Sequence, residues 1–286
     1  MEREEKDVTL NFVERGSGIP VLAVHGWTPD HRLMLGCLEP FFSGRPGYRR
    51  LYPDLPGMGK SPAPESIASS DDVLAALDDF VDRTIGDAPF LLVGESYGGY
   101  LSRALVRTRA DQVLGLALIC PIGAVVEHAD RHVPGHRVLR ADPDLLASVD
   151  PRTAEAFAEI AVVQTPETLR RFREEIMPGL DAADSAAMAR IRQRWTLTDD
   201  PEGGEPFARP TLILTGRQDS SVGYLDQFVL LPHYPRASFA VLDVAGHNLQ
   251  FEQPELFDTL MGDWLDRVDE SSQHGADGRR TRRLTG

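Results

Sequence analysis

The sequence predicts an α/β fold, with a mostly parallel central sheet and helices on both faces. Short apolar segments typical of buried strands alternate along the chain with amphipathic segments typical of helices. The chain has 286 residues, of which 42% are hydrophobic, so it can bury one large core. Residues 123–205 break the alternation, because they offer helical patterns and no convincing strand. We therefore expect one α/β domain with an all-helical insertion.

The expected strands differ in how deeply they are buried. Residues 8–13 alternate apolar and polar side chains, which is the pattern of a half-buried strand. Residues 114–119 form a continuous apolar run, typical of a central strand that is covered on both faces. The other expected strands are residues 20–24, 48–52, 90–93, 211–214 and 239–242. In such a sheet the chemistry takes place outside the carboxyl ends of the strands, so the residues that follow each strand are the candidates for a site.

Three amphipathic segments are expected to pack on this sheet as helices. Residues 71–85 carry apolar side chains at a spacing of three and four, and Ser70 or Asp71 is a candidate N-cap. Residues 97–109 and 254–268 are the other two segments. Within the insertion, further helical patterns lie at residues 142–149, 153–163, 166–176 and 182–195.

The domain boundaries follow from these patterns. We place the α/β core at residues 8–122 and 206–268, the insertion at 123–205, and flexible termini at 1–7 and 269–286. Because the insertion follows the strand that ends at Ile119, we expect it to cover the carboxyl edge of the sheet as a lid. A second helical domain elsewhere on the surface is the alternative. The C-terminal tail is expected to be flexible because its single large apolar side chain is Leu284.

The composition excludes several classes of partner. A formal net charge of −14 disfavours binding to nucleic acid or to an anionic membrane, since both require a positive face. The N-terminal residues contain no apolar core of a signal peptide, and no apolar run approaches the roughly 20 residues that span a bilayer. Cys37 and Cys120 both lie in apolar surroundings, so we expect buried, reduced thiols in a cytoplasmic protein. A single disulfide between them is the alternative.

The most informative segment is residues 90–99, Phe-Leu-Leu-Val-Gly-Glu-Ser-Tyr-Gly-Gly. A buried strand that turns sharply into a helix, with serine at the corner, is the nucleophile elbow of a serine hydrolase. The serine backbone is strained there and the helix packs close to the strand, so side chains at Gly94 and Gly98 would collide with their neighbours. The hydroxyl group of Ser96 is expected to project above the sheet, at the positive end of the helix.

Further motifs follow other expected strands in a fixed order. They are His25-Gly26-Trp27, the segment from Asp54 to Ser61 with Gly57 and Gly59, Gly216-Arg-Gln-Asp219, and Gly246-His247. Together with the elbow, they make residues 8–268 resemble a lid-bearing α/β-hydrolase of the esterase, C–C hydrolase and proline iminopeptidase group. That family has one more strand before residues 8–13, and this chain starts too late for a full one, so we expect the first edge strand to be missing.

The resemblance implies roles for five residues. Ser96 would be the nucleophile, His247 the base and Asp219 the acid, in the order that this fold uses. The chemistry agrees, because a neutral imidazole can accept the serine proton and a carboxylate can hold the imidazole in the useful tautomer. The developing oxyanion would bind to the backbone N–H groups of Trp27 and Tyr97. His25, Gly26, Asp54, Gly57 and Gly59 are expected to shape loops beside the site.

Other assignments are disfavoured by particular residues. No carboxylate follows Ile119, where some relatives place the acid, and Asp243 sits at a strand end with an unpredictable orientation. Dehalogenases and epoxide hydrolases have aspartate at the elbow, where this chain has Ser96, and the Rossmann glycine pattern is absent. His128, His132 and His136 have a metal-like spacing, but Pro134 and Gly135 would break a helix between them.

We therefore expect a cofactor-free and metal-free serine hydrolase that acts on a small acyl substrate, most simply a carboxylic ester. A meta-cleavage-product C–C hydrolase and a proline iminopeptidase are alternatives on the same fold; lid carboxylates such as Glu155, Glu159, Glu174 and Glu175 fit the latter. A lyase or a ligand-binding receptor is an alternative of another class. Candidate pocket residues in the insertion are Phe157, Phe172, Met188 and Trp195. The oligomeric state stays open.

Overall fold

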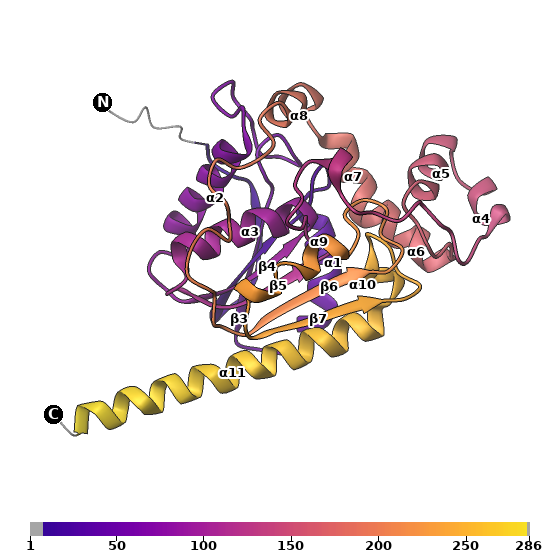
Figure 1. Ribbon diagram of the computed structural model, residues 1–286. Helices are drawn as coiled ribbons and strands as arrows, with labels where there is room; N and C mark the ends of the chain where they lie inside the picture. Colours follow the sequence, from indigo (N-terminus) through magenta and orange to yellow (C-terminus); the bar gives the residue numbers. More distant parts are fainter. Residues whose placement is uncertain (1–7, 285–286) are drawn as a thin grey trace.

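The fold is a seven-stranded sheet flanked by helices, as the sequence predicts (Figure 1). The computed structural model describes the backbone of residues 8–284 and the side chains of residues 8–272. In spatial order the strands are β1 (Phe12–Gly16), β3 (Tyr48–Pro53), β2 (Ile19–Val24), β4 (Phe90–Glu95), β5 (Val113–Ile119), β6 (Thr211–Gly216) and β7 (Ala237–Leu242). Strand β1 pairs antiparallel with β3, and all other pairs are parallel.

The core helices lie on both faces of the sheet (Figure 1). Helix α3 (Ser96–Arg109) packs against β2, β4 and β5, and α2 (Ser70–Thr84) packs on α3. Helix α11 (Pro254–Leu284) crosses β5 and β6 on the opposite face, and α1 (His31–Phe42) packs on β2 and β3. The central strands are buried on both sides, which explains their uninterrupted apolar sequences.

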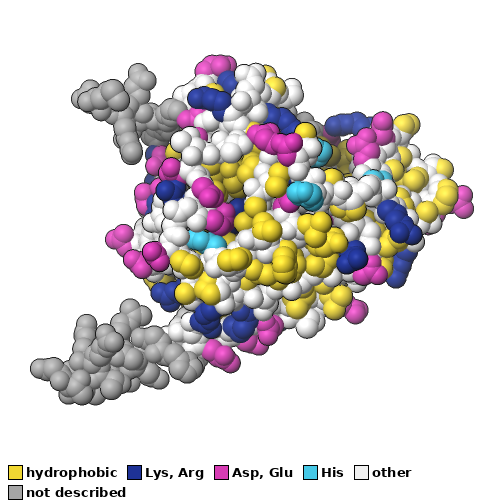
Figure 2. All heavy atoms as spheres, in the orientation of Figure 1, with side chains coloured by type: hydrophobic (Ala, Val, Ile, Leu, Met, Phe, Trp, Pro, Cys, Tyr) yellow, Lys and Arg dark blue, Asp and Glu magenta, His cyan; other side chains and the backbone are white. Residues whose placement is uncertain are grey.

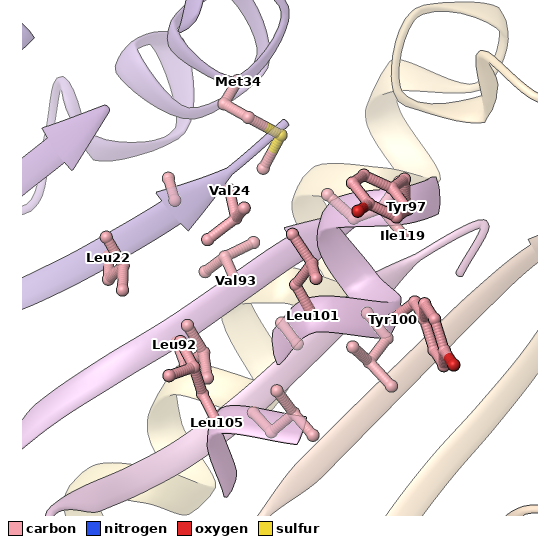
Figure 3. Packing of buried hydrophobic residues seen from close by; sticks show 14 of the residues in the cluster. Leu22, Val24, Met34, Leu92, Val93, Tyr97, Tyr100, Leu101, Leu105 and Ile119 are labelled. Atoms are coloured by element: carbon pink, nitrogen blue, oxygen red, sulfur yellow. The ribbon is translucent and has the colours of Figure 1, made fainter. Parts of the chain in front are cut away.

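The main core forms where α3 meets the central strands (Figure 3). Leu92 and Val93 of β4 lie beside Leu22 of β2 and Leu101 of α3, and all four side chains are at most 1% exposed. This packing fixes the carboxyl end of β4 and the start of α3, which is the corner that carries Ser96.

The segment between β5 and β6 is helical in the described residues. Its helical elements are η1 (His128–Asp130), α4 (Pro143–Ala147), α5 (Pro151–Ala158), α6 (Pro166–Arg171), the π-helix η2 (Phe172–Ile176), α7 (Met177–Ala182) and α8 (Ser185–Arg192). Among the described residues of this segment, the only β-type pairing is one isolated bridge between Arg140 and Val163. Three of the helices begin with proline after a capping Asp or Thr side chain, a favourable helix start.

The insertion has a small hydrophobic core of its own. Phe157, Leu169 and Phe172 pack there with Leu33 of α1 and with Phe251 of α10 (Leu249–Glu252). The insertion is therefore attached to the α/β core through apolar contacts with α1 and α10.

Several elements differ from those that the sequence predicts. Helix α1 was not predicted, because Gly36 and Pro40 interrupt its pattern, nor were the short helices α9 (Leu225–Phe228), α10 and η3 (Leu231–His233). The prediction of a strand at 8–13 is wrong in its bounds: β1 begins at Phe12, because the antiparallel partners of β3 start there. The N-cap of α2 is Ser69, whose hydroxyl accepts from the backbone N–H of Asp72.

The described backbone begins at residue 8 and ends at Leu284. Among the described residues, no strand precedes Phe12, and residues 1–7 lie outside the description. The predicted C-terminal tail at 269–286 is helical in the structure as far as Leu284, because α11 continues through it (Figure 1). The flexibility of that segment stays a prediction. No helix in the described part of the chain is both long enough and apolar enough to cross a membrane.

Candidate active site

Ser96 lies at the corner between β4 and α3, with a backbone φ of +51°. This left-handed conformation is unfavourable for a residue with a side chain, and the tight turn imposes it. A Cβ atom added at Gly94 would lie 2.4 Å from Ser102 Oγ, and one added at Gly98 would lie 2.3 Å from the carbonyl oxygen of Val24. Both positions therefore require glycine, as the sequence indicates.

A chain of hydrogen bonds joins Ser96, His247 and Asp219. His247 Nε2 lies 3.0 Å from Ser96 Oγ, and His247 Nδ1 lies 2.9 Å from Asp219 Oδ2. Asp219 is fully buried, and its other oxygen accepts backbone N–H groups of Ser221 and Val222. The structure thus brings together three side chains that lie far apart in the sequence. Asp243 does not take part, because its carboxylate accepts from the side chain of Gln218.

Within this hydrogen-bonded group, the negative charge of Asp219 and the positive charge of protonated His247 stabilise each other. Burial alone would raise the pKa of Asp219, but the charge and hydrogen bond of His247 outweigh it and lower that pKa. Burial alone would lower the pKa of His247, whereas the charge and hydrogen bond of Asp219, with a contribution from Glu95, raise it to about 9. The arrangement therefore stabilises an imidazolium, which is the form that His247 takes after it accepts a proton.

Non-glycine residues with positive φ are concentrated around this chain of hydrogen bonds. In the described residues they are Thr28, Ser96, Cys120 and Val244. Thr28 lines the same pocket as Ser96, and Val244 lies three residues before His247. The Cys120 thiol lies within 4.8 Å of the ligand atoms of Asp219 and His247. Backbone strain of this kind accumulates where the surrounding structure has to hold a functional geometry.

Trp27 and Tyr97 are both close neighbours of Ser96. Trp27 follows β2 and lines the pocket with Ser96, and its ring meets that of Tyr97 edge-on at 5.1 Å. The N–H of Tyr97 belongs to the first turn of α3, where backbone N–H groups have no partner within the helix. The side chain of Tyr97 is buried away from the pocket, and its hydroxyl donates to Ser70 Oγ.

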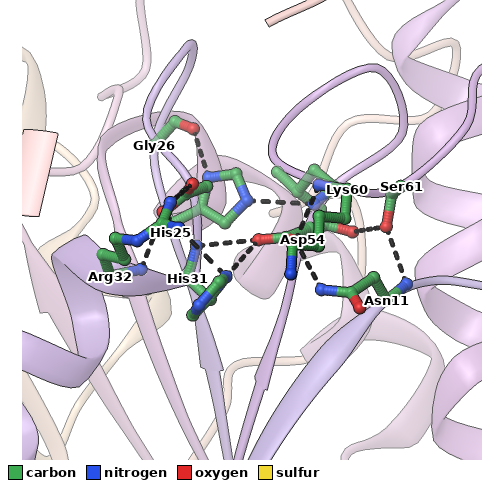
Figure 4. Close-up of polar contacts among 10 residues, drawn as sticks. Asn11, His25, Gly26, His31, Arg32, Asp54, Lys60 and Ser61 are labelled. Carbon is green, nitrogen blue, oxygen red and sulfur yellow. Dashed lines mark hydrogen bonds and ion pairs between the residues drawn. The ribbon is translucent and has the colours of Figure 1, made fainter. Parts of the chain in front are cut away.

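The loop that precedes Trp27 is held by a buried polar network (Figure 4). His25 is fully buried; its Nε2 accepts from the N–H of Leu55, so Nδ1 carries the proton and donates to the carbonyl oxygen of Gly26. Asp54 accepts hydrogen bonds from His31, Asn11 and the backbone of Lys60. Burial would raise the pKa of Asp54, but these hydrogen bonds hold it well below its usual range.

These residues shape the loops around the site. A Cβ atom at Gly59 would lie 2.4 Å from the carboxyl carbon of Asp54, and Gly57 and Gly59 both have positive φ. The turn after β3 therefore closes around Asp54, which accounts for the spacing of this motif.

A pocket of about 290 Å³ opens above Ser96 and His247. One wall comes from the α/β core, including Trp27, Leu33 and Asn248. The other wall comes from the insertion and consists of Ala156, Glu159, Ile160, Phe172, Ile176 and Leu180. A cavity of this size that combines apolar walls with polar groups around a strained serine is typical of a site for a small organic molecule.

The comparison with a protein-family model decides the family. The model described as the alpha/beta hydrolase family matches residues 21–259. The chain belongs to the α/β-hydrolase family.

Similar proteins place this hydrolase among enzymes of different specificities. The 2-hydroxymuconate semialdehyde hydrolase of Pseudomonas sp. (strain CF600) is 26% identical over 282 residues, which cover 92% of each chain. Lipase LipV of Mycobacterium tuberculosis is 34% identical over 148 residues, which cover 51% of this hydrolase and 53% of the lipase. An alpha/beta superfamily hydrolase from Oenococcus oeni PSU-1 has a TM-score of 0.83 and 28% identity, over 91% of this chain and 96% of that one.

Of the pocket residues predicted in the insertion of this hydrolase, Phe172 lines the pocket. Phe157 instead packs inside the core of the insertion, and Met188 and Trp195 belong to the main core. Periodicity identified all four as apolar, but it does not tell which face of a short helix meets a cavity. Phe172 and Ile176 lie on the π-helix, whose wider turn no hydrophobic pattern predicts.

His128, His132 and His136, whose spacing in the sequence resembles that of metal ligands, do not form a group with metal-like geometry in the structure. His132 Nδ1 lies 2.6 Å from Asp226 Oδ1. Within the described residues, the groups with metal-like spacing are Cys120–Asp219–His247 and Asp30–His31–Asp54. The first is the hydrogen-bonded site itself and the second is the loop network, so both are explained by internal hydrogen bonds. Cys37 and Cys120 are free and buried.

Sequence reasoning missed Glu95, which occupies the variable position of the elbow before Ser96. Its carboxylate lies 3.4 Å from His247 Nε2, and the side chain lines the pocket. The available signal was its position: an acidic residue at the carboxyl end of a fully buried strand has no solvent to face.

Proposed function

We propose that this hydrolase cleaves small carboxylic esters through an acyl-enzyme on Ser96. The observation that carries the proposal is the continuous hydrogen bonding from Ser96 Oγ through His247 to the buried Asp219. Such an arrangement lets a hydroxyl group lose its proton as it attacks a carbonyl carbon.

The proposed reaction has two halves. Ser96 Oγ attacks the ester carbonyl while His247 accepts its proton, and the N–H groups of Trp27 and Tyr97 bind the oxyanion. His247 then protonates the leaving alcohol, and the acyl group remains on Ser96. In the second half a water molecule, deprotonated by His247, releases the acid and restores the serine.

We further propose that the insertion at 123–205 acts as the lid of the pocket. The support is that side chains of this segment, between Ala156 and Leu180, line the same pocket as Ser96. The free, buried thiols of Cys37 and Cys120 are consistent with a protein that works in the cytoplasm.

The direct test compares the wild type with Ser96→Ala on p-nitrophenyl esters of graded acyl length. The wild type should turn over short acyl chains, which fit the pocket volume, and S96A should lose at least about 10³-fold in kcat. Equal activity of S96A and the wild type would refute the proposal. A fluorophosphonate probe should label the wild type and inactivate it in step; no labelling would favour a receptor or a lyase instead.

Cleavage of a C–C bond is the second candidate. A 26% identical relative over 92% of both chains is named for a muconate semialdehyde, which is a carboxylate-bearing compound. Hydrolysis of a ring-fission dienoate faster than of any ester in the panel would favour this candidate. The acidic side chains of the insertion by themselves do not favour a peptidase, since most of them face solvent. Figure 2 shows Asp and Glu side chains (magenta) at the surface of this part of the molecule.

A further inference from the structure

Glu95 places a second carboxyl group beside the serine and the imidazole. The side chain is 2% exposed, and its Oε1 lies 3.4 Å from His247 Nε2, the same nitrogen that meets Ser96 Oγ at 3.0 Å. Among the described residues, its one ion pair is with His247. A buried carboxyl group without an arginine or lysine partner is costly to ionise, so its charge depends strongly on its surroundings.

The second oxygen of this carboxyl group lies against the loop before Trp27. A Cβ atom added at Gly26 would lie 2.2 Å from Glu95 Oε2, and the backbone of Gly26 acts to lower the pKa of the carboxyl group. The carboxyl group therefore sits between the imidazole and the loop that supplies a proposed oxyanion N–H. A negative charge there attracts an imidazolium and repels any other anion that enters the pocket.

The rest of the described pocket lining offers no lysine or arginine to pair with such an anion. The described lining is mostly apolar; its ionisable members are Glu95, Glu159 and His247, and it includes no lysine or arginine. Glu159 stands on the insertion at the exposed side of the pocket. A carboxylate-bearing substrate would have to lose its hydration next to a buried acid, and the one cation of the described lining, the His247 imidazolium, is already paired with Asp219 and Glu95.

We propose that Glu95 is a specificity-determining residue, which restricts the pocket to uncharged acyl substrates and rejects substrates that carry a carboxylate. This inference rests on the proposed chemistry at Ser96 and names the class of substrate for it. It also disfavours the C–C bond candidate, whose substrates carry a carboxylate.

The exclusion should depend on pH, because Glu95 titrates near neutrality. Burial, together with the charge of Asp219, outweighs the opposing effects of His247 and Gly26, so that the pKa of Glu95 is raised to about 7. The thiols of Cys37 on α1 and Cys120 after β5 interact electrostatically with Glu95. Arg131, after η1, acts on His247, and Glu159, after α5, lines the same pocket as Glu95. Below its pKa Glu95 is uncharged and tolerates an anion nearby; above it, the carboxylate repels one.

The test uses two substrates that differ in charge and otherwise by a single methyl group: p-nitrophenyl hydrogen adipate, an anion, and p-nitrophenyl methyl adipate, which is neutral. Values of kcat/KM are measured from pH 6 to pH 8, and the background rate measured with S96A is subtracted. The wild type should prefer the neutral ester by about tenfold or more at pH 8, with the ratio falling toward pH 6. This part of the test needs no variant of Glu95.

Variants then assign the effect to a residue. Glu95→Gln should lower the neutral-to-anionic ratio at pH 8 at least about fivefold and remove its pH dependence, while Glu95→Asp should keep both. Glu155→Gln, on α5 but outside the pocket lining, is the matched control and should leave the ratio unchanged. Circular dichroism confirms that each variant folds.

The outcomes separate this inference from the proposed function. Ser96-dependent hydrolysis of the neutral ester, with a ratio near one in the wild type or unchanged by E95Q, overturns the inference alone. A ratio that changes with Glu159→Gln and not with E95Q also overturns it, because the charge that excludes anions would then be that of Glu159 at the exposed side of the pocket. A wild type that hydrolyses neither ester contradicts the inference and the proposed function together.

Discussion

The indole of Trp195 stacks on the phenol ring of Tyr97, with ring centroids 4.5 Å apart and ring planes 18° apart. Trp195 follows α8 at the end of the insertion, whereas Tyr97 directly follows Ser96. The ring of Trp27 meets both of them edge-on. The three rings therefore join the insertion to the two residues whose N–H groups we propose for the oxyanion.

Replacing Trp195 should weaken both the fold and the site. Trp195→Ala removes a large buried ring, so the free energy of unfolding should fall by about 3–5 kcal/mol. Trp195→Phe keeps an aromatic face and should lose about half of that or less. Urea denaturation measures the stability, and kcat on a short p-nitrophenyl ester reports the site. Equal stability of the two variants would contradict a role for the stack.

Glu252 links the loop of His247 to the insertion. Its carboxylate accepts from the backbone N–H of Gly246 at 2.6 Å and from those of Val162 and Val163 at 2.7 and 3.2 Å. Glu252→Gln would point an N–H₂ group at these donors, so we expect a loss of about 2–4 kcal/mol in unfolding free energy. kcat/KM should fall about tenfold as His247 is displaced. The control Glu255→Gln, exposed on α11, should change neither quantity.

The close approach of α3 to β2 can be tested with two glycines. Gly98→Ala would place a Cβ atom 2.3 Å from the carbonyl oxygen of Val24, whereas Gly44→Ala would meet nothing within 4 Å. Gly98→Ala should lower the unfolding free energy by more than about 3 kcal/mol or prevent folding, because two backbones have to separate. Gly44→Ala should be neutral within about 1 kcal/mol. Similar yields and melting temperatures of the two variants would be incompatible with the structure.

The raised pKa of Glu95, about 7, also makes a prediction for stability. An acid whose pKa is higher in the folded state contributes stability that is present below its unfolded pKa and is lost as the pH rises through the folded value. Relative to Glu95→Gln, the wild type should therefore lose about 1–3 kcal/mol of unfolding free energy between pH 4.5 and pH 8. Urea unfolding of both proteins across this range measures the difference. A constant difference would show that Glu95 titrates alike in both states.

The sequence was most informative where a strand ends in a motif. Parallel strands bring their carboxyl ends to one edge, so residues that follow different strands could be expected to lie close together. The choice of Ser96, Asp219 and His247 among them depended on the resemblance of the motifs to a known family. The glycines of the elbow could also be interpreted from the sequence, because strand and helix approach so closely at Gly94 and Gly98 that a side chain there would clash.

Other features depend on tertiary contacts that no local pattern encodes. Helix α1 forms despite Gly36 and Pro40; Gly36 leaves room for the side chain of Glu175 from the π-helix, and a Cβ atom there would lie 2.2 Å from its carboxyl carbon. The partner of Glu95, likewise, is a histidine far along the chain. Which apolar residues of the insertion face the pocket follows from the packing of short helices, which hydrophobic periodicity does not determine.

The two walls of the pocket come from parts of the chain with unequal freedom to change. Strands and the strained corner at Ser96 fix one wall, and mutations there endanger the whole sheet. The opposite wall, with Phe172 and Ile176, belongs to short helices that contribute nothing to the sheet. Evolution can therefore alter the shape of that wall while it leaves the reacting groups in place, and an exchange of this segment between relatives is a natural route to chimeric enzymes with new preferences.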